Sequence, residues 1–171
     1  IGGILMPGDG SADPSGVTHM LAKAARQEGA QIFEKSPIEE IITKDGKISG
    51  VKVNSQIINC EYIVLASGMW SRQIGEKAGV SIPLYPAEHF YIITEPIENL
   101  SKTLPVIRDF DNRTYIKEDA GKILVGIFEG NSIPAWDKTN KVPEDFSFGE
   151  FQENFNHFEP YLKSAIKRFP V

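Results

Sequence analysis

Hydrophobic and polar residues follow a helical period near the start of the chain. Apolar side chains between Val17 and Ala25 recur at spacings of three and four residues, which is typical of an amphipathic helix. We expect this helix to begin with Ser15 as its N-cap, to end at Gly29 and to bury one face. Residues 1–14 are rich in Gly, Pro and Asp, and this composition predicts an entry loop.

Strand patterns follow the helical segment. Residues 30–34 favour a short strand. Residues 38–44 and 47–53 flank Asp45-Gly46, a dipeptide that strongly favours a two-residue hairpin turn. A further strand at 56–60 completes a predicted antiparallel meander of three strands.

The run at residues 62–66 is apolar without alternation. Such a run predicts a strand that is buried on both faces of a parallel sheet. It leads directly into Ser67-Gly68-Met69-Trp70-Ser71. A helix is expected from Ser71 to Ala78, closed by Gly79.

The second half of the chain has mostly strand patterns, with helical patterns at its end. Strands are predicted at residues 88–95, 114–117 and 123–129, and residues 130–143 predict a long loop. Two helices are predicted at the end, about 148–158 and 161–169, because Pro160 interrupts the helical pattern. This order of elements predicts an α/β fold with α+β character: part of a Rossmann-like lobe, with an antiparallel sheet as a second layer.

Composition narrows the classes of partner. The 171 residues contain 18 Lys and Arg against 23 Asp and Glu, a net charge of -5 without a basic cluster, which argues against a nucleic-acid partner. No apolar run approaches the roughly 18–20 residues of a membrane helix. The single cysteine, Cys60, favours a reducing compartment such as the cytoplasm. We interpret the start at Ile1-Gly2-Gly3, without Met, as that of a piece of a longer protein.

The glycine-containing turn at residues 66–71 is the first candidate for ligand binding. The fingerprint G-x-G-x-x-G is absent, since Gly8-Asp9-Gly10 is followed by Asp13 and no strand precedes it. A strand that ends in small residues lets a ligand approach the main chain at the edge of a sheet. The same residues also suit a tight packing turn with Trp70 in the core, and residue types alone favour that second interpretation.

His89 and Tyr115 are the candidate polar residues of the second half. Strand alternation places His89, Tyr91, Ile93 and Glu95 on one face. A histidine among aromatic residues can bind a carboxylate or tune a flavin, although a structural histidine is commoner. Tyr115 can hydrogen-bond a substrate or simply pack. Neither a metal site nor a nucleophile elbow G-x-S-x-G is predicted.

Several motifs occur together in one order along the chain. They are Gly2-Gly3, Pro7-Gly8-Asp9-Gly10-x-x-Asp13-Pro14, residues 66–71, Pro83-Leu84, residues 88–95, Arg108-Asp109 and Thr114-Tyr115-Ile116-Lys117. This ordered set resembles the middle of the dimethylglycine dehydrogenase and sarcosine dehydrogenase family, within the FAD-dependent amine oxidoreductases that include D-amino acid oxidase.

The resemblance implies a fragment of a flavoenzyme. Residues 15–82 would belong to an FAD-binding lobe, and residues 1–14 and 83–171 to a substrate lobe. The parent would oxidise a small N-methylated amino acid by hydride transfer to FAD, with tetrahydrofolate as a further ligand, in the cytoplasm or, in a eukaryote, the mitochondrial matrix. Its partners would be this substrate and the rest of the same polypeptide, without nucleic acid or membrane.

The resemblance also implies roles for individual residues. His89 and Tyr115 match active-site residues on facing strands over the flavin. Ile38 matches a position whose main-chain atoms meet the adenine, and Ala66, Gly68 and Trp70 match the turn beside the diphosphate and ribityl groups. Some relatives keep the scaffold without dehydrogenase activity, so a regulatory scaffold that acts through a protein partner is the alternative.

Overall fold

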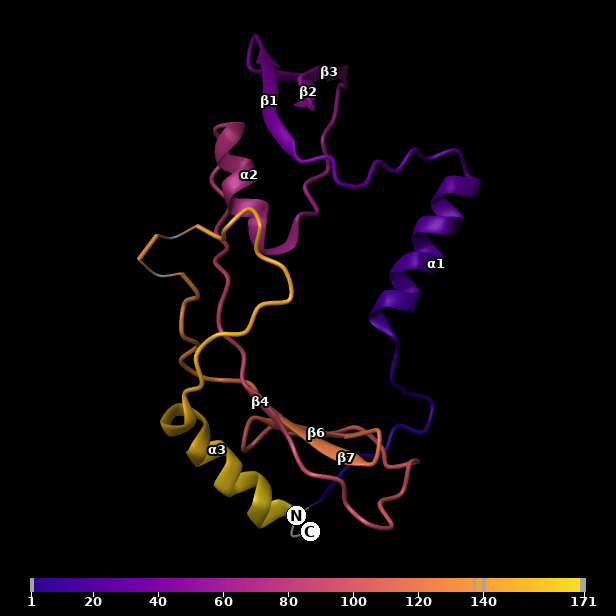
Figure 1. Ribbon diagram of the computed structural model, residues 1–171, viewed down its shortest axis with the longest axis vertical. Helices are drawn as coiled ribbons and strands as arrows, with labels where there is room; N and C mark the ends of the chain where they lie inside the picture. Colours follow the sequence, from indigo (N-terminus) through magenta and orange to yellow (C-terminus); the bar gives the residue numbers. More distant parts are fainter. Residues whose placement is uncertain (1, 137, 140, 170–171) are drawn as a thin grey trace. The chain divides into compact units, whose positions relative to one another are not determined.

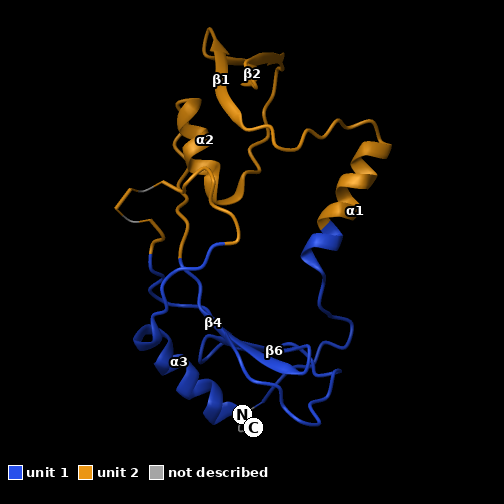
Figure 2. Ribbon diagram, in the orientation of Figure 1, with its two compact units in different colours: residues 1–17, 88–133, 149–171 blue, residues 18–87, 134–148 orange. Residues whose placement is uncertain are grey.

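A computed structural model describes residues 2–136, 138–139 and 141–169 (Figure 1). Main-chain contacts divide the chain into two compact units (Figure 2). Unit 1 comprises residues 1–17, 88–133 and 149–171, and unit 2 comprises residues 18–87 and 134–148. The predicted lobe boundaries at residues 14 and 82 stay a prediction, and residues 1, 137, 140, 170 and 171 of the predicted substrate lobe lie outside the described residues.

Unit 2 contains the predicted meander. Strands β1 (Ile38–Lys44), β2 (Lys47–Val53) and β3 (Gln56–Asn59) form an antiparallel sheet in the order β1-β2-β3. Asp45 and Gly46 have φ angles of 52° and 73°, the left-handed values that a two-residue hairpin turn needs. The prediction of the hairpin is therefore confirmed.

A helix of the same unit packs beside the meander. The short 3-10 helix η1 (Gly68–Trp70) leads into α2 (Ser71–Lys77), and Gly79 at φ 71° follows the helix end, as the sequence predicts. The Lys77 ammonium donates to the carbonyl oxygens of Ile38 and Glu39 at 2.8 and 3.1 Å. These bonds tie the end of α2 to the start of β1.

Two strands predicted for this unit are absent from the described residues. Residues 30–34 and 62–66 form no β-ladder with any other described segment. Tyr62 and Val64 are 85% and 90% exposed. The prediction of a buried strand at 62–66 is wrong for this chain. An apolar run indicates only that its side chains favour burial. A strand also needs a neighbouring strand that completes its main-chain hydrogen bonds.

Helix α1 (Pro14–Gln27) differs from its prediction at its start and on its face. The Asp13 carboxylate accepts from the main-chain N–H groups of Ser15 and Gly16 at 3.1 and 3.0 Å, so Asp13 and not Ser15 caps the helix. No residue of α1 is buried, and Met20 and Leu21 are both 62% exposed. The predicted buried face is therefore uncovered here, although the helical period itself is confirmed.

Unit 1 is built on an antiparallel sheet. It contains β4 (Tyr91–Ile93), β5 (Ile107–Asp109), β6 (Thr114–Asp119) and β7 (Lys122–Ile127), in the order β4-β7-β6-β5. One face carries a row of apolar residues, in which Ile107 pairs with Ile116, Ile116 with Val125, and Val125 with Ile92. The predicted antiparallel layer is thus confirmed, with strands shorter than expected at 88–95 and 123–129.

Helix α3 (Phe155–Arg168) covers this apolar face. Its Ala165 joins the core of Ile116, Ile123 and Val125, with Phe169 packed against it. The helix continues through Pro160, so the prediction of two separate helices is wrong. The Asn154 side chain caps its start by accepting from the His157 main-chain N–H at 3.1 Å, and this cap and the packing offset the one hydrogen bond that a proline removes.

Candidate active site

The second face of the sheet in unit 1 carries polar and aromatic residues. Arg108 pairs with Tyr115, Tyr115 with Gly126, and Gly126 with Tyr91, so these four residues form one row across all the strands. They alternate with the residues that meet α3 and therefore lie on the opposite face. Tyr91 is 52% exposed, which leaves this face open in the described part of unit 1.

Gly126 explains how Tyr115 reaches β4. A Cβ atom built on Gly126 would overlap Cζ, Cε1 and Oη of Tyr115. The Tyr115 ring therefore lies directly over the β7 main chain, because β7 has no side chain at this point. His89 lies two residues before β4, and β7 separates β4 from β6, which carries Tyr115. The missing side chain bridges that separation.

His89 and Tyr115 form a hydrogen-bonded pair on this face. The Nε2 atom of His89 lies 3.1 Å from the Tyr115 hydroxyl, and the ring planes are within 5° of parallel at 5.9 Å. The centre of the Phe128 ring lies 5.7 Å from that of the His89 ring and 5.2 Å from that of the Tyr115 ring. Burial, and then the nearby Tyr91 and Glu129, raise the pKa of Tyr115, while Arg108 opposes this shift. Tyr115 thus keeps its proton at neutral pH and can donate it in a hydrogen bond.

Glu129 lies behind the pair. Its side chain is only 3% exposed, whereas that of His89 is 43% exposed. One carboxylate oxygen accepts from the Phe90 main-chain N–H at 3.2 Å, and the other lies 3.6 Å from Nδ1 of His89. The second distance is that of an ion pair and is longer than a hydrogen bond.

Arg108 supplies a cation to the open face. Its guanidinium carbon lies 4.0 Å from the centre of the Phe128 ring and 5.6 Å from that of Phe110. Among the residues that the structure describes, no carboxylate pairs with Arg108. The planar guanidinium is therefore available for a carboxylate ligand.

Sequence reasoning identified two residues of this site and missed the others. The structure brings His89 and Tyr115 together, and their catalytic roles stay predictions. Gly126, Phe128 and Glu129 had no assigned role, and Arg108 entered only as part of a motif. A glycine inside the apolar strand of residues 122–127 was a usable signal, because such a glycine often marks the close approach of another group.

The predicted cofactor residues all lie in unit 2. Gly68 has φ 53°, and nothing lies within 4 Å of a Cβ built on it, so its main chain is open to a ligand. Trp70 is half-buried and donates from Nε1 to the Pro143 carbonyl at 3.2 Å, which suits a packing role equally well. Ala66 is exposed, and the carbonyl of Ile38 already accepts from Lys77. These four assignments stay predictions.

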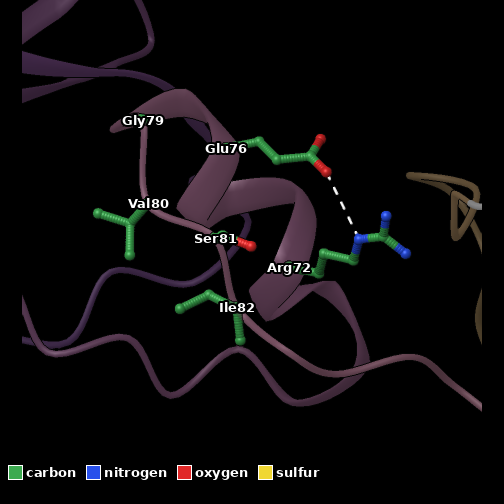
Figure 3. Close-up of a pocket in the computed structure, with 6 residues that line it drawn as sticks. All are labelled: Arg72, Glu76, Gly79, Val80, Ser81 and Ile82. Carbon is green, nitrogen blue, oxygen red and sulfur yellow. Dashed lines mark ion pairs between the residues drawn. The ribbon is translucent and has the colours of Figure 1, made fainter.

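A shallow cavity also lies in unit 2, beside α2. It has a volume of about 270 Å³ and is lined by Arg72, Glu76, Gly79, Val80, Ser81 and Ile82 (Figure 3). The Arg72 and Glu76 side chains form an ion pair of 3.5 Å one helical turn apart. None of the predicted site residues lines this cavity.

The described residues were also considered as metal ligands and as membrane-spanning segments, with the following result for each. In the part of the chain that the structure describes, no cluster of three or more His, Cys, Asp or Glu side chains is arranged to hold a metal ion. No helix in the described ranges has the length and apolar character needed to cross a membrane.

Comparison with known families places the chain. All of it, residues 1–171, matches the family model described as FAD dependent oxidoreductase, so the chain belongs to that family. This finding confirms the predicted family resemblance and the prediction that FAD is the cofactor of this family.

Curated relatives narrow the similarity. The chain is 36% identical to 4-methylaminobutanoate oxidase (formaldehyde-forming) of Paenarthrobacter nicotinovorans over 96% of its length, and 33% identical to sarcosine dehydrogenase of Homo sapiens over 99%. It is also 34% identical, over 100% of its length, to the mitochondrial pyruvate dehydrogenase phosphatase regulatory subunit of Mus musculus. The chain spans only about a fifth of these proteins, 20%, 18% and 20% respectively.

A solved structure supports the fold. L-proline dehydrogenase from P. horikoshii superposes with a TM-score of 0.68 at 27% identity, covering 92% of this chain and 41% of that protein. The mixed helical and antiparallel architecture is therefore that of a known flavoenzyme scaffold.

Proposed function

We propose that the whole protein containing this chain oxidises a small N-methylated amino acid, with FAD as the hydride acceptor. The observation that carries this proposal is the His89 and Tyr115 pair beside the unpaired Arg108 on the open face of unit 1. The names of the related oxidase and sarcosine dehydrogenase describe substrates that share an N-methyl amine and a carboxylate. On the open face, Arg108 can bind the carboxylate, and the His89 and Tyr115 pair can interact with the amine.

The residues of this chain suit part of the cofactor. Gly68 leaves its main chain open to a close ligand. The chain has no G-x-G-x-x-G loop for the diphosphate. We assign Ile38 to the adenine of FAD, and Ala66, Gly68 and Trp70 to its diphosphate and ribityl groups. The residues of the sheet in unit 1 are assigned to the substrate. FAD, when bound, supplies the acceptor for the hydride of the N-methyl carbon.

Arg108 binds the substrate carboxylate in this proposal. Two parallel N–H groups of a guanidinium match the two oxygens of a carboxylate. The Phe128 ring under the guanidinium restricts its position without neutralising its charge. Arg108 and Tyr115 are directly paired across β5 and β6, so a bound carboxylate would lie close to the Tyr115 hydroxyl.

Tyr115 and His89 prepare the amine. Hydride loss from the N-methyl carbon requires the nitrogen lone pair, and an alkylammonium group has none. The Tyr115 oxygen takes a proton from the ammonium while the Tyr115 hydroxyl passes its own proton to Nε2 of His89, 3.1 Å away. The products of this step are a neutral amine and an imidazolium, and the charge is conserved.

Further features of the activity follow from the same proposal. The oxidised amine is hydrolysed or passes its one-carbon unit to tetrahydrofolate, and the reaction takes place in the cytoplasm or the mitochondrial matrix, in keeping with the mitochondrial relatives. The partners are the substrate and the rest of the polypeptide. The similarity to a phosphatase regulatory subunit supports a second candidate, a non-catalytic scaffold that binds a protein partner.

The two candidates predict different behaviour of the purified whole protein. An amine oxidoreductase carries FAD whose absorbance at about 450 nm bleaches when sarcosine, dimethylglycine or 4-methylaminobutanoate is added without oxygen. His89→Ala should lower turnover with little loss of stability, whereas His19→Ala, in α1, should leave turnover unchanged. A protein without flavin bleaching by any N-methyl amine would contradict the proposal and favour the scaffold.

A further inference from the structure

We propose that Glu129 is a positioning residue that fixes the tautomer of His89. This inference deepens the proposed function and rests on it. Glu129 lies just after β7, with a side chain only 3% exposed, and it touches His89 on the side of the ring away from Tyr115. It faces the His89 ring, and its charge also helps to raise the pKa of Tyr115.

The carboxylate is held in place by the main chain. Its Oε1 atom accepts from the Phe90 N–H at 3.2 Å, which links the end of β7 to the residue that follows His89. Its Oε2 atom lies 3.6 Å from Nδ1 of His89. Within the described residues, this carboxylate is the only ion-pair or hydrogen-bond partner of Nδ1.

The two ring nitrogens of a neutral imidazole have opposite roles. One carries a proton and donates, while the other carries a lone pair and accepts. An ionised carboxylate only accepts, so the nitrogen that faces Glu129 is the one that keeps its proton. Nε2 then presents its lone pair to Tyr115.

This assignment sets the direction of the Tyr115 hydrogen bond. The Tyr115 hydroxyl donates to Nε2, and the lone pairs of its oxygen are free to accept from a substrate ammonium. The opposite tautomer would make Nε2 a donor to the same oxygen, and Tyr115 could not pass on its proton. The buried charge of Glu129 also stabilises the imidazolium that forms when His89 receives a proton.

Glu129→Gln tests the inference with almost no change of shape. The Phe90 N–H needs an acceptor, so it selects the amide oxygen and turns the NH₂ group toward Nδ1. An N–H group then faces Nδ1 in place of a negative charge, so the preference for a proton on Nδ1 is lost and the opposite tautomer is favoured. We expect kcat/KM for the N-methyl amine to fall roughly 10- to 100-fold in the holoenzyme, as for orienting partners of metal-bound histidines.

Glu118→Gln is the matched control. The Glu118 carboxylate also accepts from a main-chain N–H, that of Gly121 at 2.7 Å, at the turn between β6 and β7. Glu118→Gln removes one negative charge from the same sheet, as Glu129→Gln does, but at a position outside the open face. We expect kcat/KM to change less than twofold in this variant, and an equal loss in both variants would overturn the inference.

The tautomer can also be observed directly, without measuring turnover. In ¹⁵N NMR of histidine-labelled protein at about pH 9, where an ordinary histidine is neutral, the couplings of each ring nitrogen to the ring hydrogens identify the protonated one. The His89 signals are those that disappear in His89→Ala. We expect a proton on Nδ1 in the wild type and on Nε2 in Glu129→Gln. A proton on Nε2 in the wild type, or on Nδ1 in both proteins, overturns the inference.

These readouts separate the two proposals. If the protein oxidises no N-methyl amine, the proposed function fails, and the tautomer still decides the role of Glu129. If His89→Ala loses turnover while Glu129→Gln keeps both turnover and tautomer, the proposed function stands and the present inference fails.

Discussion

At Gly126 the strand β7 carries a hydrogen where its neighbours carry side chains, and the Tyr115 ring occupies the space. His89 lies two residues before β4, and β7 separates β4 from the strand β6 that holds Tyr115, so the 3.1 Å contact of the two side chains depends on this position. A glycine weakens an isolated strand, and here the cost is offset by the aromatic packing of Tyr115 with Phe128. The geometry of the candidate site thus depends on an atom that is absent from one residue.

Gly126→Ala should displace Tyr115. The new methyl group overlaps the ring, and such overpacking typically costs about 1–3 kcal/mol of stability. We expect a lower melting temperature and a loss of amine turnover in the whole protein. Gly10→Ala, at an exposed glycine with open space around its Cα, should change neither. In a Tyr115→Ala background the added methyl should cost much less stability, and an unchanged cost would exclude the overlap as its cause.

Tyr115→Phe removes the hydroxyl and keeps the ring. One hydrogen bond to a charged group contributes about 1.5–3 kcal/mol, so substrate handling should weaken roughly 10- to 150-fold while folding is nearly unaffected. Steady-state kinetics of the whole enzyme measure this effect. A change below about twofold would place Tyr115 in the packing and not in the chemistry.

At the scale of elements, the end of β5 is fastened to the end of α3. The Asp109 carboxylate accepts from Arg168 Nε at 2.8 Å, and from the side-chain and main-chain N–H groups of Asn112 at 2.7 and 3.1 Å. The Asn112 side chain first, and then its main chain and Arg168, lower the pKa of Asp109, although burial opposes them. The helix that covers the apolar face is thereby held at its last turn.

Asp109→Asn should destabilise the protein in a pH-dependent way. The folded-state pKa lies below the ordinary value of 3.8, so the ionised carboxylate stabilises the fold above that value and stops doing so as the pH falls through the lowered pKa. We expect a loss of about 1 kcal/mol at pH 7, the upper range for a partly exposed pair, that shrinks as the pH falls below 3.8 and through the lowered pKa. Urea unfolding across this range measures it, with Asp111→Asn in the same turn as the control. A loss of stability that does not change with pH would show that the charge of Asp109 does not contribute to stability.

Elements with a local cause could be predicted, and those with a distant cause could not. The hairpin of β1 and β2 follows from Asp45-Gly46, and α2 follows from its closing glycine. The run at residues 62–66 depends on neighbours that no local pattern shows, and α3 continues through Pro160 because the sheet packs against it.

Site residues divide in the same way. His89 and Tyr115 stood out by residue type and family motif, whereas Glu129 and Arg108 gain their roles from the register of four strands.

At the scale of the whole molecule, large apolar residues lie exposed outside the open face. Met20 and Leu21 of α1 and Val64 are 62%, 62% and 90% exposed. Large apolar side chains are favoured to leave water when a partner surface is present. Because the chain spans about a fifth of its curated relatives, we expect other parts of the whole protein to cover these residues.

The same consideration predicts weak cofactor binding by residues 1–171 alone. The chain lacks the glycine-rich loop whose main-chain N–H groups hold a diphosphate, so most of the affinity for FAD should lie elsewhere in the whole protein. Titration followed by flavin fluorescence should give weak or no binding for residues 1–171, and tight binding for the whole protein. Submicromolar binding by residues 1–171 would contradict this expectation.

Unit 1 is assembled from three separate stretches of chain, and this arrangement limits how relatives can be recombined. A chimera that exchanges only residues 88–133 transplants the open face together with Glu129, but it leaves α3 from the recipient against a foreign apolar row. The Asp109 and Arg168 pair would then join residues of different parents. A hybrid designed to alter the amine preference should therefore take residues 88–133 and 149–171 from the same parent.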